Sequence, residues 1–192
     1  MPIFKLYSEQ SMGMSHYGDV MASGEGEIEL TDEEVRLLVN LIKENGGETD
    51  VEELDLENKY PDIYEKLEEA CEELASKVAW AHWVIEGYEN SYYDYDIDEV
   101  MDNCESYGFR FDPEEHREEW GYEPDEDMDE DIIADARQDA FDKWLTEYRR
   151  KLSDIEDAEF LNGAFGIQPD DYDYSYDVVI PEEIVKMATG ED

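Results

Sequence analysis

Basic residues are scarce in this chain of 192 residues. Only 14 lysines and arginines face 57 aspartates and glutamates, so the formal net charge at pH 7 is −43. Binding to DNA, RNA or an anionic membrane surface requires a basic face on the protein. The charge balance therefore excludes direct binding to all three, and it points to a partner that is itself basic.

Cysteines and long apolar runs are also few. Cys71 and Cys104 cannot build a disulfide framework, and they fit a reducing cytoplasm. No apolar stretch approaches the roughly 18 residues of a membrane span. Residues 1–10 lack the basic start and the apolar stretch of a signal peptide. We therefore expect a cytoplasmic protein without a membrane partner.

The chain nevertheless has the material for a core. It is 41% hydrophobic and contains 4 Trp, 14 Tyr and 6 Phe, which is too rich for a disordered acidic tail. A globule of this length buries roughly 70% of its unfolded surface. Because no internal repeat and no Pro- or Ser-rich linker divides the sequence, we expect one domain over residues 1–192.

Apolar residues at three- and four-residue steps predict two long amphipathic helices. The first begins at Pro61 and continues to about Tyr88, and the second covers residues 132–152. Thr31 and Glu34 have the spacing of a capping box, which predicts a helix that ends at Gly46. Further short helices are predicted over residues 97–107, over residues 113–120 and from Pro181 onward.

Strand-like patterns stand at both ends of the chain. Residues 3–7 are apolar and β-prone, and residues 19–22 and 27–30 are short candidates interrupted by glycines. Residues 172–178 alternate Tyr and Val with Asp and Ser, which is the period of a strand. The expected fold class is therefore α+β, with a small sheet of N- and C-terminal strands, two long helices and several short ones.

No set of residues predicts catalysis. The histidines have no Ser or Cys motif beside them, and His82 lies in a helical apolar stripe that favours a packed side chain. No glycine-rich phosphate loop is present. Since 57 acids must place some carboxylates in pairs, such pairs carry no information. We expect a protein that is not an enzyme and needs no cofactor.

Two segments approach the spacing of an EF-hand calcium loop. Residues 171–182 place ligand types at positions 1, 3, 5, 7 and 12, but Tyr176 stands where the loop needs glycine. In residues 94–105 Glu99 occupies that position. At this density of acids such matches arise by chance, so weak, diffuse cation binding is expected and no specific metal site.

The acids are unevenly distributed. No lysine occurs between Lys77 and Lys143, and residues 112–131 contain a dense run of acids. Ordinary surfaces mix both signs, which lowers self-repulsion and allows ion pairs one helical turn apart. Because this stabilisation is absent over a third of the chain, a property other than folding favours the pattern.

The spacing of the acids suggests imitation of a nucleic acid. Neighbouring phosphates on one DNA strand are roughly 6–7 Å apart. Carboxylates four residues apart on a helix start about 5–6 Å apart, and alternate residues on a strand are about 6.8 Å apart. A compact globule of this length, about 42 Å across, would span roughly 12 base pairs. The candidate partner-binding residues are a helical row (Glu65, Glu69, Glu73), two extended rows (Asp94, Asp96, Asp98; Asp173, Asp177) and an acidic cluster (Glu114, Glu115, Glu118, Glu119, Asp125, Glu126, Asp127, Asp129).

In charge, size, Tyr and Trp content and scarcity of basic residues, the whole chain resembles the acidic DNA-mimic proteins of phages and mobile elements, which include anti-restriction and anti-CRISPR inhibitors. The resemblance is compositional, so no family residue can be carried over. It implies that the protein binds the cationic groove of a host defence nuclease, or of another basic DNA- or RNA-binding protein, and blocks access of DNA. If the protein is phage-encoded, this would happen in the cytoplasm of the host cell.

Other interpretations of the composition remain open. A salt-adapted protein of unrelated function, an acidic chaperone or decoy for basic proteins such as histones, and a cation-buffering protein would all be strongly acidic. The aromatic run over residues 88–95, which we expect to be exposed, is a candidate seam for a homodimer.

Overall fold

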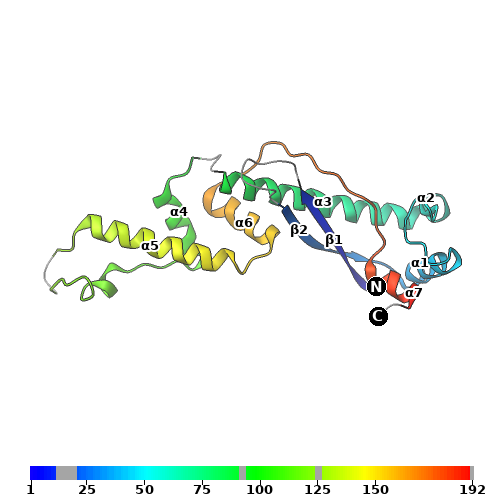
Figure 1. The fold of residues 1–192 in the computed structure, drawn as a ribbon, viewed down its shortest axis with the longest axis horizontal. Coiled ribbons are helices and arrows are strands. Elements are labelled where there is room, and N and C mark those ends of the chain that lie inside the picture. Colours follow the sequence, from blue (N-terminus) through cyan, green and yellow to red (C-terminus); the bar gives the residue numbers. More distant parts are fainter. Residues whose placement is uncertain (12–20, 91–93, 124–126, 191–192) are drawn as a thin grey trace.

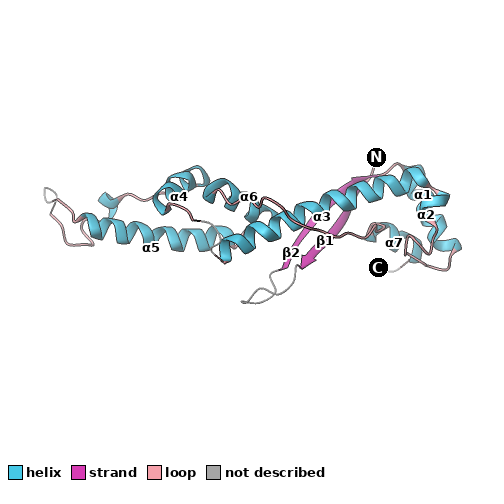
Figure 2. Ribbon diagram, turned by 90° about the horizontal axis from the view of Figure 1, so that it is seen from above, coloured by secondary structure: helices cyan, strands magenta, loops and turns pink. Residues whose placement is uncertain are grey.

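The computed structural model describes residues 1–11, 21–90, 94–123 and 127–190. Its longest element is α3 (Pro61–Glu89), which the apolar spacing predicted. At 1.5 Å per residue this helix is about 43 Å long. The other elements lie along it and beyond one of its ends, so the body is elongated (Figures 1 and 2). They are β1 (Ile3–Ser11), β2 (Met21–Glu29), α1 (Asp32–Glu44), α2 (Leu56–Lys59), α4 (Ile97–Cys104), η1 (Glu105–Tyr107), η2 (Pro113–His116), α5 (Glu130–Arg149), α6 (Asp154–Phe165) and α7 (Glu182–Thr189).

The core consists of two apolar clusters placed end to end along α3. Leu67 and Val78 of α3 belong to the first cluster, which also contains residues of both strands and of α1, α2 and α7. Ala81 and Ile85 belong to the second, built with α4, α5 and α6. The expected compact globule about 42 Å across is wrong, because α3 alone is about that long and α5 continues the body beyond its end (Figure 1). Ile155 of α6 packs against both clusters and connects them.

The sheet contains two antiparallel strands, in a register that pairs Ile3 with Glu29. The two short candidates predicted near residues 19–30 are one strand, β2, although residues 19 and 20 lie outside the described part. Gly24 and Gly26 do not break it. They allow α3 to approach, since a Cβ on Gly24 would lie 2.8 Å from Val78 Cγ2 and one on Gly26 would lie 3.2 Å from Leu74 Cδ2.

The α+β class is confirmed, but the C-terminal strand is not. Residues 172–178 are extended and form no ladder with the sheet. The segment instead runs beside α3 (Figure 1) and is held by side chains. The amide of Gln10 donates to Ser175 O at 2.7 Å, and the Tyr174 hydroxyl donates to Glu72 Oε1 at 3.1 Å. Its alternating tyrosines therefore lie against a helix and against one another rather than on a sheet.

Several helix boundaries follow from the caps that the sequence contains. Thr31 Oγ1 accepts from Glu34 N, and Glu34 Oε2 accepts from Thr31 N, so the capping box of α1 is confirmed. The helix predicted over residues 97–107 is α4 followed by η1, and it ends at Gly108, whose φ is 102°. The long helix over residues 132–152 is confirmed as α5, and the terminal helix as α7.

Other boundaries differ from the prediction. Of the helix predicted over residues 113–120, only the short 3-10 turn η2 is present. Two helices, α2 and α6, were not predicted. None of the described helices combines the length and the apolar character that crossing a bilayer requires.

Candidate functional site

The predicted helical row lies on α3. Glu65, Glu69 and Glu73 are exposed on the helix, while residues such as Leu67 and Leu74 are buried in the first cluster. Each step of four residues advances about 6 Å along the helix axis. This is close to the separation of roughly 6–7 Å between phosphates on one DNA strand. The core thus holds these three carboxylates on a rigid support at phosphate-like intervals.

The extended C-terminal segment adds a second set of acids beside this row. Tyr174 borders a shallow pocket with Glu69 and Glu73, and the Tyr172 hydroxyl lies 3.4 Å from Ser76 Oγ. Tyr174 and Tyr176 stack with ring centroids 6.5 Å apart. The segment carries exposed aspartates between and beyond these rings. We call the combined surface the acidic ridge, and it consists of Glu65, Glu69, Glu73, Asp173 and Asp177.

Two tyrosines beside the ridge have raised pKa values. The pKa of Tyr174 is raised, chiefly because its hydroxyl donates to the carboxylate of Glu72. The pKa of Tyr176 is also raised, first by burial and then by the charges of Glu72 and Glu68. In the opposite direction, the hydrogen bond from Lys77 to Glu73, 2.6 Å long, lowers the pKa of that carboxyl. The carboxylate of Glu73 is therefore ionised at neutral pH.

The extended row predicted over Asp94, Asp96 and Asp98 does not exist. Asp96 is the N-cap of α4, and its Oδ1 accepts from the backbone N–H of Asp98 at 3.0 Å. Asp98 lies inside the helix, with Oδ1 3.4 Å from Arg137 Nη1. The capping preference of aspartate turns the chain into a helix at this point, which removes the alternation of a strand. Asp94 is exposed in the preceding loop.

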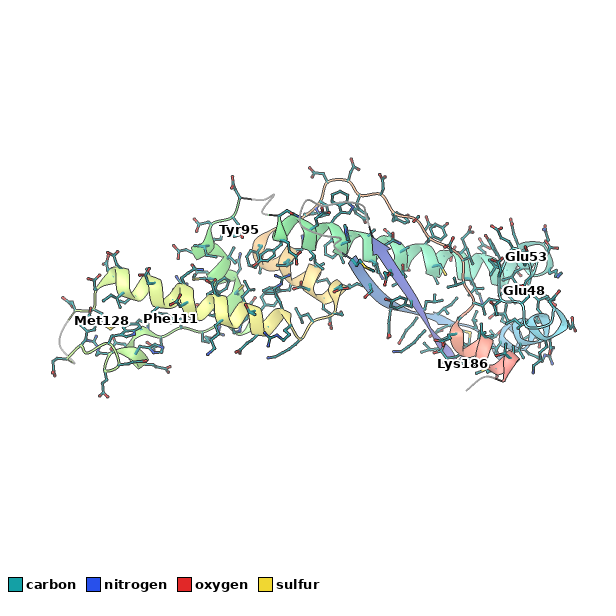
Figure 3. All side chains as sticks on the ribbon, in the orientation of Figure 1. Glu48, Glu53, Tyr95, Phe111, Met128 and Lys186 are labelled. Atoms are coloured by element: carbon teal, nitrogen blue, oxygen red, sulfur yellow. The ribbon has the colours of Figure 1, made fainter. Side chains whose placement is uncertain are left out.

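The acidic cluster of residues 114–129 lies at the opposite end of the molecule from α1 and α2, as the positions of Met128 and Glu53 show (Figure 3). Two of its acids have local partners. Glu114 accepts from both Nε and Nη2 of Arg117 at 2.9 Å, which lowers its pKa, and Glu119 Oε2 lies 3.3 Å from His116 Nδ1. Asp129 is the N-cap of α5. Three further acids of the cluster are exposed, namely Glu115, Glu118 and Asp127. The remaining two, Asp125 and Glu126, lie outside the described residues. The structure does not bring this cluster together with the acidic ridge.

A further carboxylate row was missed in the sequence. Asp131, Asp135 and Asp139 are exposed at four-residue steps on α5. We call them the α5 row. The four-residue spacing of acids that identified the row on α3 is also present in this part of the sequence. Residues 112–131 were selected for the number of acids they contain and not for the spacing of those acids, so the row was missed. Both long helices therefore carry carboxylates about 6 Å apart along their axes.

Many of the basic side chains are held in ion pairs with acids of the same chain, and each such pair neutralises one carboxylate. These pairs include Lys5–Glu25, Arg36–Glu33, Lys66–Glu34, Arg137–Asp102, Arg149–Asp157 and Lys186–Glu182. Among the described acids only Glu86 and Asp157 are buried. The surplus of negative charge therefore lies on the surface.

The histidine and cysteine side chains and the possible metal ligands offer little for other chemistry. Within the described ranges no three His, Cys, Asp or Glu side chains are gathered around a point that would suit a metal ion. His82 is fully buried in α3, where it was predicted to pack. Both cysteines are buried, which raises the pKa of Cys71 and raises that of Cys104 to about 11.

The proposed dimer seam is only partly described, because residues 91–93 lie outside the described residues. At its two ends, Tyr88 and Tyr95 pack edge-to-face on Phe165, with ring centroids 5.1 and 5.2 Å away. Tyr88 is half-buried, so it is not the exposed residue that the sequence suggested. A homodimer stays a prediction.

No protein-family model, curated protein or solved structure matches this chain.

Proposed function

We propose that this protein is a DNA mimic that inhibits a DNA-binding protein. Its carboxylates occupy the cationic groove of a host defence nuclease, or of another basic DNA- or RNA-binding protein, and block the entry of DNA. The observation that carries the proposal is the exposed carboxylates at steps of about 6 Å on both long helices.

The dimensions of the molecule suit this role. α3, with its 29 residues, is about 43 Å long, which corresponds to roughly 13 base pairs at 3.4 Å each. α4 and α5 extend the body beyond one end of α3 (Figure 1). A cationic groove that follows a duplex would thus meet acids over much of its length. Affinity would come from many modest interactions and from counterion release, as it does for DNA itself.

The rigidity of the support also favours the proposal. Glu65, Glu69 and Glu73 are fixed on a helix whose other face is buried, so binding does not need to order a flexible chain. A disordered acidic tail would lose much of its interaction energy in that ordering.

The proposal extends to the setting of the protein. We infer a viral or mobile-element inhibitor of the anti-restriction or anti-CRISPR kind, which acts in the cytoplasm of the host cell. Inhibition is stoichiometric and needs no catalysis, metal or cofactor, because the ridge acts by occupying the groove. A salt-adapted protein or a histone-type decoy would share the charge but would not require regular rows.

The experiment compares two variants of equal net charge. Glu65→Gln, Glu69→Gln and Glu73→Gln together remove the row on α3, whereas Glu44→Gln, Glu53→Gln and Glu57→Gln remove three exposed acids near α1 and α2. The target is first captured from a bacterial lysate and eluted with a salt gradient. Loss of the row should weaken binding and reduce the slope of log affinity against log salt by about one for each ion pair that the variant can no longer form with the target.

The control variant shows whether affinity for the target depends on the position of the carboxylates or on the net charge alone. If the control variant binds as tightly as the parent and the row variant does not, the position of the carboxylates matters. If the two variants show the same drop in affinity, only the net charge is recognised, and the DNA-mimic proposal is wrong. Circular dichroism of both variants shows whether α3 remains folded.

A further inference from the structure

The outer edge of β1 presents backbone groups that β2 does not use. Leu30 N donates to Pro2 O, so in this register the even-numbered residues of β1 exchange hydrogen bonds with β2. The N–H and C=O groups of Lys5, Tyr7 and Glu9 therefore point away from β2. In the part of the chain that the structure describes, no backbone hydrogen bond reaches them from another segment.

Ser23 of β2 confirms this assignment of directions. It pairs with Glu9 in the register, so its N–H also points outward, and there it donates to Asp154 Oδ2 of α6 at 2.8 Å. An outward-pointing N–H in this sheet can thus be satisfied by a side chain. On β1 the corresponding groups face an open groove.

That groove separates β1 from the C-terminal segment. Two adjoining hollows of about 240 and 370 Å³ share Leu6, Tyr7 and Val179 in their walls. One wall is residues 5–10 of β1 and the other is residues 175–183. We call this feature the β1 groove. The Gln10 side chain crosses it to Ser175 O, but the two backbones remain unpaired.

The walls of the β1 groove are acidic. The one lysine among its described lining residues, Lys5, is bound to Glu25 with Nζ 2.6 Å from Oε2. Glu183 also lines this groove, and its buried Oε2 has no hydrogen-bond partner among the described residues. The acids that line the groove are Glu9, Glu25, Asp177, Glu182 and Glu183.

We propose that an extended, basic segment of a partner protein adds to β1 as a third strand in the β1 groove. Its backbone pairs with Lys5, Tyr7 and Glu9, a stretch of about 14 Å. Its lysine or arginine side chains, at alternate positions, meet the acidic walls. Among the described residues this surface shares only Asp177 with the acidic ridge. Its backbone pairing along the edge of β1 does not depend on the DNA-mimic function.

A second copy of the chain is a poorer occupant of the same edge. It would also carry a net charge of −43, and long-range repulsion would oppose the approach of two such molecules.

The test uses a peptide of about ten residues in which lysine alternates with valine. A second peptide has the same sequence with N-methyl groups on the valine amides, so it keeps the charge but cannot complete a ladder. We expect the first peptide to slow hydrogen exchange of the Tyr7 and Glu9 amides and to bind roughly tenfold or more tightly than its methylated form.

Two variants separate backbone pairing from simple attraction of charge. Tyr7→Pro removes an outward N–H without removing a hydrogen bond to β2, and Tyr7→Ala removes the same side chain but keeps the N–H. Tyr7→Pro should weaken binding of the unmethylated peptide roughly tenfold relative to Tyr7→Ala. Both variants should retain the acidic ridge and any competition with DNA.

Three results would overturn the inference. If both peptides bind equally well to both variants, the attraction is ionic and no strand is added. If the Tyr7 and Glu9 amides are already protected in the free protein in a manner that depends on its concentration, a second copy occupies the edge. If they are protected without such dependence, the chain closes its own edge.

Discussion

The ion pair between Arg149 and Asp157 joins three helices of the second cluster, and its removal is the sharpest test of how that part is held together. Arg149 Nε lies 2.8 Å from Asp157 Oδ1, and Nη2 lies 2.7 Å from Oδ2. The same guanidinium lies 4.4 Å from the centroid of the Tyr88 ring on α3. The pair therefore connects the end of α5 with the start of α6 and with α3.

The perturbation is Asp157→Asn, which keeps the size of the side chain and removes its charge. Burial would lower the pKa of Arg149, but its hydrogen bond to Asp157 and the charge of that carboxylate raise it above the usual value. Breaking a fully buried pair costs about 3–5 kcal/mol. Because the two side chains remain 21% and 12% exposed, we expect a smaller loss, about 2–3 kcal/mol.

The assay is thermal unfolding followed by circular dichroism at pH 7. For a chain of this length the expected loss corresponds to roughly 5–10 °C in Tm. Glu159→Gln, an exposed position on the same helix, is the matched control, and it should change stability by less than about 0.5 kcal/mol. Both variants remove one negative charge and so relieve general repulsion equally. An unchanged Tm for Asp157→Asn would refute the claim that this pair fastens α5 and α6.

Three further predictions concern other parts of the chain. Burial would raise the pKa of Glu34, but hydrogen bonds from Lys66 and Thr31 lower it. The contribution of Glu34 to folding stability is therefore present above its unfolded-state pKa and is lost as the pH falls. In urea unfolding, Glu34→Gln should cost about 1 kcal/mol at pH 7 and nearly nothing well below pH 4.5. Cys71 and Cys104 are buried with raised pKa values, so a thiol reagent at pH 8 should modify them only as fast as the protein opens, and rapid modification of the native protein would contradict their burial. Because like charges repel, moderate salt should raise the Tm, and calcium should act no differently from magnesium at equal ionic strength, whereas stabilisation by micromolar calcium alone would reveal a specific site.

The elements that could be predicted from the sequence are those whose signals are local. The Thr31–Glu34 capping box and the apolar period of residues 61–88 each specify a helix by themselves, and the structure has both. α6 had a local signal that was overlooked, since Ser153 and Glu156 form a second capping box with the same spacing. The second long helix was predicted to end at residue 152, and no element was assigned to the apolar residues that follow it in α6.

Features that depend on contacts distant in sequence could not be predicted. Residues 172–178 have the period of a strand, but a strand needs a partner, and α3 offers the tyrosines an alternative through Glu72 and Ser76. Asp96 is a different case, because its Oδ1 accepts from the backbone N–H groups of Asp98 and Glu99 at the start of α4. The extended row expected there was wrong although the signal for a cap is local. The row on α3 was predictable because period and exposure on a helix follow from sequence alone.

Competition with duplex DNA tests the central proposal most directly. The captured target is mixed with labelled duplex DNA and increasing amounts of this protein at about 50 mM and 500 mM NaCl. We expect that one or two copies per target displace the DNA, that excess DNA added first protects the target, and that affinity falls steeply at the higher salt concentration. A tight complex that is indifferent to salt, or one that forms while DNA stays bound, would contradict the DNA-mimic proposal.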